Sequence, residues 1–288
     1  MTQTLTMSLV SRFQSYPAPA KLNLMLKVVG RRADGYHLLE TVFRLLDYGD
    51  TLEIAPRDDG VINLQTPTPG VAPHQDLTVR AARLLQQETA CRAGADLRLL
   101  KRIPMGGGLG GGSSDAATVL LVLNRLWRTG LSRQQLMELG LSLGADVPVF
   151  IFGRNAYARG IGEKLSEIKL PRRWYVVLNP GVQVPTAEIF SSPLLTRNSP
   201  PRIMPILETT QPNENDLQQV ACALYPAIGR ALEELSSFGS ALMTGSGSCL
   251  FLECASREQA EKIFSSTSKK YDGFVAAGLD HHPLFDGD

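Results

Sequence analysis

The first clear pattern in the chain is an alternation of apolar and polar residues over positions 21–28. Leucine or valine occupies positions 22, 24, 26 and 28, and Lys21 and Asn23 stand between them. Because successive side chains of a strand point to opposite faces, this period of two predicts a β-strand with one buried face. Lys21 and Asn23 are then expected to project together from the other face.

The rest of the N-terminal half is predicted to alternate between strands and helices. An apolar-rich segment, residues 38–46, follows the turn signal Asp34-Gly35. Strands are expected over residues 51–54, 61–64 and 97–103, with a turn at Asp59-Gly60 between the first two. Helices are expected after the cap residue Asp76, over the uniformly apolar run 116–127, and from the capping pattern of Ser132 and Gln135 to about Leu143. Residues 149–152, which follow Asp146-Val147-Pro148, are predicted to be β-rich.

The C-terminal half is predicted to form an α+β unit of its own. Its expected strands cover residues 174–178, 241–244, 249–253 and 273–279. Its expected helices cover residues 215–224, 227–235 and 256–266, and the last begins with a capping pattern of Ser256 and Gln259. Since residues 165–173 have the pattern of a crossing between the halves, we expect two domains, residues 1–168 and 169–288.

The amino-acid composition leaves these predicted elements unchanged, but it excludes some classes of protein. The chain has 288 residues, of which 43% are hydrophobic and 20% charged, with a formal net charge of +1. This balance excludes wholesale disorder and offers no strong field to hold nucleic acid or an anionic membrane. The longest uncharged apolar run, residues 116–123, is far shorter than the ~20 residues of a membrane span. We expect a cytoplasmic protein, a monomer or weak homodimer, without nucleic-acid or membrane partners.

Cysteine and histidine usage predicts no metal site. Four cysteines, Cys91, Cys222, Cys249 and Cys254, show no CxxC spacing and are expected to be buried or half-buried free thiols. Three of the histidines, His74, His281 and His282, are expected to be solvated. The first twenty residues lack the pattern of a secretory signal, and we can assign no function to residues 1–16.

The most informative segment is a glycine run over residues 106–112, in which only Leu109 is not glycine. The string Gly-x-Gly-x-x-Gly matches a dinucleotide-binding fingerprint, but residues 129–135 lack the acidic residue that this fingerprint requires about twenty positions later. A P-loop is excluded because Ser113, and no lysine, follows the last glycine. A protein kinase is excluded because the chain has neither an HRD nor a DFG motif.

A loop almost free of Cβ atoms nevertheless suits an anion, because backbone N–H groups can surround it. Ser113, Ser114 and Asp115 are expected to open the following helix, whose N-terminus adds unpaired N–H groups and partial positive charge. Polyphosphate is the natural ligand of such a loop. A flexible linker or a tight turn is the alternative, but each ordered glycine costs about 0.5–1 kcal/mol, and a run of them favours a functional explanation.

Residues 104–117 resemble the phosphate loop of the GHMP small-molecule kinases. Further segments resemble the branch of that family that phosphorylates a cytidine diphosphate-linked methylerythritol, and the likeness runs from about residue 17 to 278. These segments are Pro19-Ala20-Lys21-Leu22-Asn23-Leu24, Arg32-Ala33-Asp34-Gly35-Tyr36-His37, residues 143–150, Asn179-Pro180-Gly181 and Thr244-Gly245-Ser246-Gly247-Ser248.

The resemblance implies an enzyme that transfers a phosphoryl group from ATP, with Mg²⁺ as the counterion of the nucleotide. The acceptor would be the 2-hydroxyl of 4-diphosphocytidyl-2-C-methyl-D-erythritol, in the non-mevalonate route to isoprenoid precursors. The implied fold is a two-domain α+β GHMP kinase fold. It combines a ribosomal-S5-domain-2-like α/β domain with a C-terminal ferredoxin-like α+β domain, and the active site lies in the cleft between them.

The resemblance also implies roles for individual residues. The catalytic pair falls on Lys21 and Asp146, with Asp146 as the general base. The ATP-binding residues fall on Pro104, Met105, Gly106, Gly107, Gly108, Leu109, Gly110, Gly111, Gly112, Ser113 and Ser114. The residues that would line the acceptor site are Asn23, Tyr36, His37, Phe43, Lys101, Thr186, Gly245, Ser246 and Gly247.

Without the resemblance, each of these residues has a plainer interpretation. Asp146 could satisfy backbone donors of its loop, Lys21 could be a solvated strand lysine, and Asp115 could serve only as a charge at a helix N-terminus. Two other functions also stay open. One is a GHMP kinase with a different alcohol acceptor, and the other is a non-catalytic nucleotide-binding protein. A dehydrogenase is disfavoured by the missing ribose-binding acid.

Overall fold

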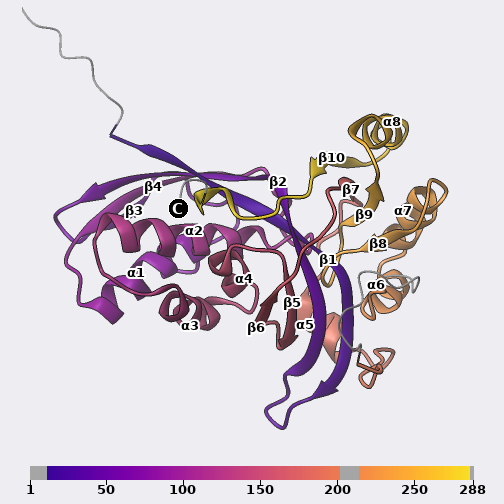
Figure 1. Cartoon of the computed structure of the whole chain (residues 1–288), viewed down its shortest axis with the longest axis horizontal. Coiled ribbons are helices and arrows are strands. Elements are labelled where there is room, and N and C mark those ends of the chain that lie inside the picture. The colour runs from indigo at the N-terminus through magenta and orange to yellow at the C-terminus, as the bar shows by residue number, and fades with distance from the viewer. Residues whose placement is uncertain (1–11, 202–213, 286–288) are drawn as a thin grey trace, which may run out of the picture.

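The structure is a computed structural model that describes residues 12–201 and 214–285. Within these residues two β-sheets, one of six strands and one of four, lie side by side with helices packed on each (Figure 1). This arrangement confirms the expected α+β class with two layered units.

The first sheet has the strand order β3-β4-β2-β5-β6, and β1 pairs with β2. Its strands are β1 (Gln14–Arg31), β2 (His37–Arg57), β3 (Ile62–Leu64), β4 (Gly94–Leu100), β5 (Ala156–Gly160) and β6 (Lys164–Glu167). Its helices are α1 (Leu77–Thr89), α2 (Gly111–Leu126), α3 (Arg133–Leu143) and α4 (Val147–Phe152). Helix α2 packs on both α1 and β1, so the segment predicted to be a buried helix lies at the centre of this half.

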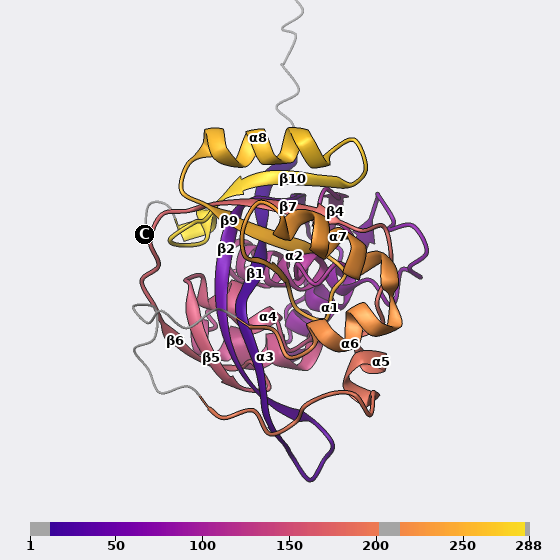
Figure 2. The same ribbon diagram turned by 90° about the vertical axis from the view of Figure 1, so that its right-hand side faces the viewer.

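The second sheet has the strand order β10-β7-β9-β8. Its strands are β7 (Trp174–Asn179), β8 (Ala241–Met243), β9 (Leu250–Cys254) and β10 (Asp272–Ala277). The helices of this half are α5 (Thr186–Ser191), α6 (Gln218–Leu224), α7 (Pro226–Ser236) and α8 (Arg257–Thr267), and a 3₁₀ turn, η2 (Pro283–Phe285), follows the last strand. Helices α7 and α8 pack on the sheet, as Figure 2 shows from the side.

The two halves share the long hairpin of β1 and β2, which reaches far beyond the first sheet (Figures 1 and 2). The strands pair antiparallel from Gln14 opposite Ile54 to Arg31 opposite His37. At its tip, the predicted turn contains Gly35 with φ of 93°, a conformation that glycine adopts without strain.

The prediction of one exposed face for β1 was wrong, because both faces are buried. Leu22 packs in a cluster with Tyr175 and Phe251 of the second sheet. On the opposite face, Lys21 and Asn23 are also buried, against the glycine loop and the loop after β8. The alternation correctly placed Lys21 and Asn23 side by side, but it could not show that a second unit covers the strand.

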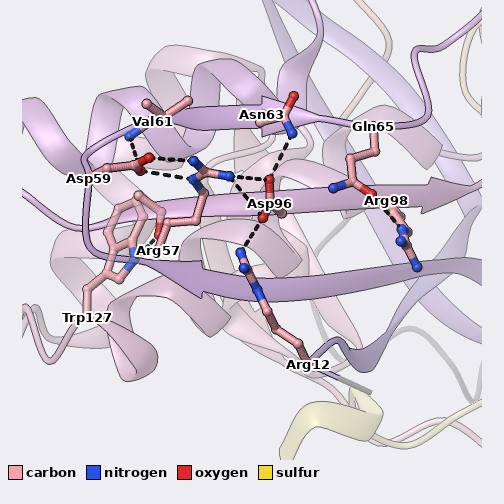
Figure 3. A network of polar contacts seen from close by, with 10 residues as sticks. Arg12, Arg57, Asp59, Val61, Asn63, Gln65, Asp96, Arg98 and Trp127 are labelled. Carbon is pink, nitrogen blue, oxygen red and sulfur yellow. Dashed lines mark hydrogen bonds and ion pairs between the residues drawn. The ribbon is translucent and has the colours of Figure 1, made fainter. Parts of the chain in front are cut away.

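Polar contacts tie β2, β3 and β4 together at the far end of the first sheet (Figure 3). Asp96 on β4 is buried and accepts hydrogen bonds from Asn63 at 2.8 Å and from Arg57 at 3.0 Å. Arg57 also pairs with Asp59, whose carboxylate accepts the N–H of Val61 at 3.1 Å. This network holds the predicted turn at Asp59 so that β3 runs parallel to β4.

Capping signals were reliable predictors of helix starts. Asp76 accepts the N–H of Thr78 at 2.9 Å, and Ser132 and Gln135 form the expected capping box at the start of α3. Ser256 likewise accepts the N–H of Gln259 at the start of α8. Helix α2, however, begins at Gly111, before the serines that were expected to open it.

The prediction of a β-rich segment at residues 149–152 was wrong, because these residues form helix α4. Pro148 lies in the first turn, where its missing N–H is not needed. A Cβ atom on Gly140 of α3 would lie 2.7 Å from Val147 and 2.8 Å from Ile151, so the two helices meet without space for a side chain. This close packing overrides the β preference of the branched residues.

The C-terminal residues return to the first sheet. The N–H of Leu279 donates to the carbonyl of Leu45 at 2.8 Å, and that of His282 donates to Gly153 at 2.9 Å. His282 is therefore fully buried, which contradicts the expectation that it is solvated, whereas His74 and His281 are exposed as expected. The predicted division at residue 168 lies between β6 and β7, but it stays a prediction.

The cysteines are free, as expected, with Cys249 and Cys254 buried and the other two half-buried. None of the helices within residues 12–201 and 214–285 combines the length and hydropathy of a membrane-crossing segment.

Candidate active site

A cavity of about 730 Å³ lies where the two halves meet. Its walls come from the outer part of the β1–β2 hairpin, the glycine loop, helix α5 and the loop between β8 and β9. The cavity thus brings together segments that are far apart in the sequence. Most of the predicted site residues line it: Lys21, Asn23, Tyr36, His37, Phe43, Gly106, Gly108, Gly110, Ser113, Asp146, Thr186, Gly245, Ser246 and Gly247.

Lys21 and Asp146 form an ion pair in this cavity, with Nζ of Lys21 3.2 Å from Oδ2 of Asp146. The lysine side chain is only 2% exposed, whereas the aspartate side chain is 34% exposed. Asp146 lies in the short turn between α3 and α4, directly before the first residue of α4. The buried ammonium holds the carboxylate from one side, and the other side of the carboxylate remains accessible from the cavity.

Asn23 holds Lys21 in place. Nζ of Lys21 donates to Oδ1 of Asn23 at 2.6 Å, and Nδ2 of Asn23 donates to Thr41 at 2.8 Å. The backbone N–H of Asn23 also donates to Oγ1 of Thr244 at 2.9 Å. These partners fix the orientation of the amide, so Asn23 presents an acceptor to Lys21 and links it to the loop after β8.

The ring of Phe43 packs against the ammonium of Lys21. The ring is buried, and its centroid lies 5.6 Å from Nζ of Lys21, within the range of a cation–π contact. Predicted as an acceptor-site residue, Phe43 is thus one of the contacts that position the lysine.

The glycine loop wraps over Lys21. The N–H of Lys21 donates to the carbonyl of Leu109 at 3.0 Å, and Leu109 itself is buried. A Cβ atom at Gly110 would lie 2.9 Å from Phe150 and 3.1 Å from Cε of Lys21. With φ of 73°, Gly110 also adopts a backbone conformation that favours glycine. The loop therefore lies against Lys21 more closely than a chain with side chains could.

A second cavity, of about 440 Å³, lies on the other side of the same loop. Its lining includes Met105, which is half exposed, and Lys101. The remaining predicted loop residues Pro104, Gly107, Leu109, Gly111 and Gly112 line it as well. Ser114 is fully buried and lines neither cavity.

Lys101 lies in this second cavity and does not line the first, in which Tyr36 and His37 lie. Its ammonium is bound between two buried carboxylates, that of Asp50 and that of Asp115, whose Oδ2 lies 2.9 Å away. Burial alone lowers the pKa of Lys101, but the two carboxylates outweigh that effect and raise it. Burial raises the pKa of Asp115 far above its ordinary value, and Asp50 adds to this shift.

Tyr36 and His37 lie at the hairpin end of the first cavity. Tyr36 is 60% exposed, while His37 is half-buried and stacks on Phe190 with ring centroids 4.9 Å apart. Burial, followed by the charges of Arg197 and Arg31, lowers the pKa of His37. The two aromatic side chains and Phe190 therefore offer flat surfaces with one polar ring edge.

Helix α5 and the loop after β8 close the cavity. The hydroxyls of Thr186 and Ser246 lie 2.8 Å apart, within hydrogen-bond distance. A Cβ at Gly245 would lie 3.0 Å from the carbonyl of Gly108, so this loop packs directly on the glycine loop. The predicted residues Thr186 and 245–247 are thus brought together with Lys21, although more than 160 positions separate them in the chain.

This chain is similar to known proteins of one kinase family. The N-terminal and C-terminal domain models of the GHMP kinases match residues 76–154 and 191–273. A protein of Chromobacterium violaceum named 4-diphosphocytidyl-2-C-methyl-D-erythritol kinase is 63% identical over 277 residues, which are 95% of this chain and 98% of that protein. A protein of the same name from Neisseria meningitidis serogroup A is 52% identical over 96% of this chain and 99% of its own.

The chain belongs to the 4-diphosphocytidyl-2-C-methyl-D-erythritol kinase family of the GHMP kinases. It is therefore a small-molecule kinase, as the resemblance implied. A crystal structure of a 4-(cytidine 5'-diphospho)-2C-methyl-D-erythritol kinase is similar to this kinase with a TM-score of 0.81 at 34% identity, over 92% of this chain and 99% of the other. A homoserine kinase from Cytophaga hutchinsonii, at 15% identity, shares the fold with a TM-score of 0.69.

Sequence reasoning missed several residues that line the kinase's cavity or contact its lining. Phe190 lines the cavity and stacks on His37, but an aromatic residue in a short amphipathic helix has the same pattern as a core residue. Arg197 contacts His37 from a segment without any motif. Thr41 and Thr244 hold Asn23, and only Thr244 had a signal, because it begins the motif 244–248.

Proposed function

We propose that this kinase transfers the γ-phosphoryl group of ATP to the 2-hydroxyl of 4-diphosphocytidyl-2-C-methyl-D-erythritol. One observation carries the proposal: the Lys21–Asp146 pair, the Tyr36–His37 end and the glycine loop share a single cavity. The names of the 52–63% identical relatives support this acceptor. The reaction would belong to the non-mevalonate route to isoprenoid precursors.

The glycine loop is the proposed binding site for the phosphates of ATP. It separates the two cavities, so a nucleotide in the second cavity can extend its phosphates along the loop towards the first. Backbone N–H groups of the loop and of the first turn of α2 would contact the phosphate oxygens. Lys101 lies on the nucleotide side in this proposal, and the acceptor occupies the first cavity.

Asp146 is the proposed general base. As the bond between the acceptor oxygen and phosphorus forms, the hydroxyl proton passes to the carboxylate, and the bond from phosphorus to the β-phosphate oxygen breaks to release ADP. The exposed side of Asp146 makes it accessible for this transfer. Lys21 holds the carboxylate in position and places positive charge next to the oxygen on which negative charge develops.

The cytidine end of the acceptor would lie between Tyr36 and Phe190, with His37 at its polar edge. Tyr36 is exposed enough to lie over a ring, and Phe190 already stacks on His37. Asn23, Thr186 and Ser246 line the cavity between this end and the loop, where the methylerythritol and its phosphates would lie. The cavity volume of about 730 Å³ lies in the range of about 300–1,000 Å³ that small-molecule sites occupy.

Magnesium fits this site as a partner of the phosphates. No group of three or more His, Cys, Asp or Glu side chains that could hold a metal occurs in the described part of the chain. Mg²⁺ in kinases is commonly bound by one or two protein oxygens together with substrate phosphates. The hydroxyl of Ser113, directly after the glycine loop, lines the first cavity and is the oxygen that would contact it. When bound, Mg²⁺ neutralises phosphate charge.

The decisive experiment is incubation of the purified protein with Mg-ATP and the cytidyl substrate, followed by ³¹P NMR. A new phosphomonoester signal that appears together with ADP supports the proposal. The same assay with homoserine and mevalonate as acceptors tests the alternative of a different alcohol. Turnover of one of these acceptors and not of the cytidyl compound would overturn the assignment.

A further inference from the structure

Arg197 occupies an unusual position behind the base-binding end of the cavity. It lies in the segment after α5, which crosses the β1–β2 hairpin, where the N–H of Ser199 donates to the carbonyl of Val28 at 3.0 Å (Figure 2). No motif in the sequence marks this arginine, and the proposed reaction does not use it directly. Its contacts nevertheless connect the two elements that carry Phe190 and His37.

Three carbonyl groups, from the end of α5 and from the turn that follows it, converge on the guanidinium of Arg197. Nη2 donates to Phe190 at 3.0 Å and to Ser192 at 2.7 Å, and Nη1 donates to Leu195 at 3.1 Å. The last carbonyls of a helix lack partners within the helix, and a cation is favourable there. The arginine thereby fixes the last turn of α5, which carries the ring of Phe190.

The fourth contact of Arg197 goes to His37, whose Nε2 lies 3.1 Å from Nε of the arginine. A guanidinium can only donate hydrogen bonds, so Nε2 of His37 must accept. A neutral imidazole that accepts at Nε2 carries its proton at Nδ1. The contact therefore selects one of the two neutral tautomers.

The surroundings of His37 favour this neutral form. Burial, Arg197 and Arg31 all lower the pKa of the imidazole. Arg31 lies opposite His37 in the hairpin register, and Asp34 and Tyr36 of the same turn line the cavity beside it. On the other side, the neutral ring of Phe190 packs against the imidazole.

We propose that Arg197 is a positioning residue of the acceptor site. It holds His37 as the Nδ1–H tautomer and fixes the stacked ring of Phe190, so that the imidazole presents a donor to the acceptor atoms of a cytosine edge. This inference rests on the proposed function. It also predicts a preference for cytosine over uracil, because N3 of cytosine accepts a hydrogen bond, whereas N3 of uracil carries a proton.

Steady-state kinetics of Arg197→Met and Arg197→Lys test the positioning role. Since a hydrogen bond to a charged group is lost, KM for the cytidyl substrate is expected to rise about tenfold in Arg197→Met, with kcat and KM for ATP nearly unchanged. Arg197→Lys keeps the positive charge but loses the planar guanidinium, so its KM for the cytidyl substrate should lie between those of the wild type and Arg197→Met. Arg230→Gln, which removes an exposed arginine on α7 that lines neither cavity, is the control and should leave all three constants unchanged.

A double-mutant cycle separates action through His37 from a general structural effect. In the background of His37→Ala, the substitution Arg197→Met is expected to raise KM for the cytidyl substrate far less than in the wild type. Equal effects in both backgrounds, or a parallel rise of KM for ATP, would show that Arg197 does not act through His37.

Nitrogen-15 NMR of His37 gives a readout that needs no turnover. The chain has four histidines, and the spectrum of His37→Ala assigns the signal. We expect protonated Nδ1 and unprotonated Nε2 in the wild type, and in Arg197→Met a mixture of tautomers with a higher pKa. If Arg197→Met fails to fold, the wild-type spectrum and Arg197→Lys still decide, since a proton on Nε2 in the wild type overturns the proposal.

The two proposals fail in different ways. If the wild type does not phosphorylate the cytidyl substrate, the proposed function fails, and the tautomer of His37 still reports on Arg197. If the substrate is phosphorylated but His37 carries its proton on Nε2, only the inference about Arg197 is wrong.

Discussion

Lys21 and Lys101 approach neighbouring glycines of the same loop, but the carboxylates around them differ in number and in exposure. This difference suggests a chemical role for one lysine and a structural role for the other. A Cβ at Gly110 would lie 3.1 Å from Lys21, and one at Gly111 would lie 3.2 Å from Nζ of Lys101. Lys21 has one carboxylate partner, Asp146, which is partly exposed to the cavity. Lys101 has two, Asp50 and Asp115, and both are buried.

The difference in charge balance has a physical consequence. One ammonium next to one accessible carboxylate leaves that carboxylate available to a ligand. One ammonium between two buried carboxylates leaves an excess of negative charge, and the raised pKa of Asp115 shows how unfavourable a second buried charge is. The pair of Lys21 and Asp146 therefore suits proton transfer. Lys101, Asp50 and Asp115 instead hold the start of α2 against the end of β4.

The largest expected effect comes from Asp146→Asn. If Asp146 is the general base, the variant loses about 10²–10⁴-fold in kcat, or roughly 3–5 kcal/mol of transition-state stabilisation. KM for both substrates should change little, because the amide keeps the shape of the carboxylate. Steady-state kinetics with the cytidyl substrate measure this, and Asp272→Asn, an exposed aspartate on β10, serves as the control. A near-normal kcat in Asp146→Asn would show that the base assignment is wrong.

Lys101→Met should instead affect stability. Removing the cation leaves the buried carboxylates of Asp50 and Asp115 without a positive charge beside them, which lowers the free energy of unfolding by about 3 kcal/mol near neutral pH. The loss should be smaller in acid, where a carboxyl group can be protonated. Urea denaturation at several pH values measures it, with the exposed Lys262→Met as the control. An unchanged midpoint would mean that the three side chains form no stabilising unit.

Tyr36→Ala tests the hairpin end of the first cavity, away from Lys21 and Asp146. Since the exposed ring would stack on the base, KM for the cytidyl substrate should rise up to about tenfold. KM for ATP should stay close to its wild-type value, because Tyr36 lines the first cavity and not the second. An equal rise in both constants would indicate a folding defect and contradict a role in base binding.

A last prediction concerns the pH dependence of stability. Because the pKa of Asp115 is raised in the native state, the native protein retains a proton that the unfolded chain releases. This contribution is present below the ordinary value of 3.8 and is lost as the pH rises through about 7. Between these values the free energy of unfolding of the wild type should fall relative to that of Asp115→Asn. Parallel denaturation curves across this range would contradict the assignment.

Local patterns in the sequence were sufficient for much of the fold. Capping residues predicted the starts of α3 and α8, the turn at Asp34 was correct, and the period of two placed Lys21 next to Asn23. The glycine run was recognisable as a loop between a strand and a helix, and its role in binding phosphate stays a prediction. Each of these features depends on neighbouring residues, whose backbone geometry and hydrogen bonds act over one turn or one strand.

Tertiary structure decided the rest. Asp146 reaches Lys21 only because α4 packs on α3, and the same packing converted an apparent strand into a helix. Arg197 and His37 are separated by 160 positions and meet because the segment after α5 crosses the hairpin. A pair of residues so far apart leaves no local pattern in the sequence, since its energy comes from burial and charge that arise only when the two halves meet.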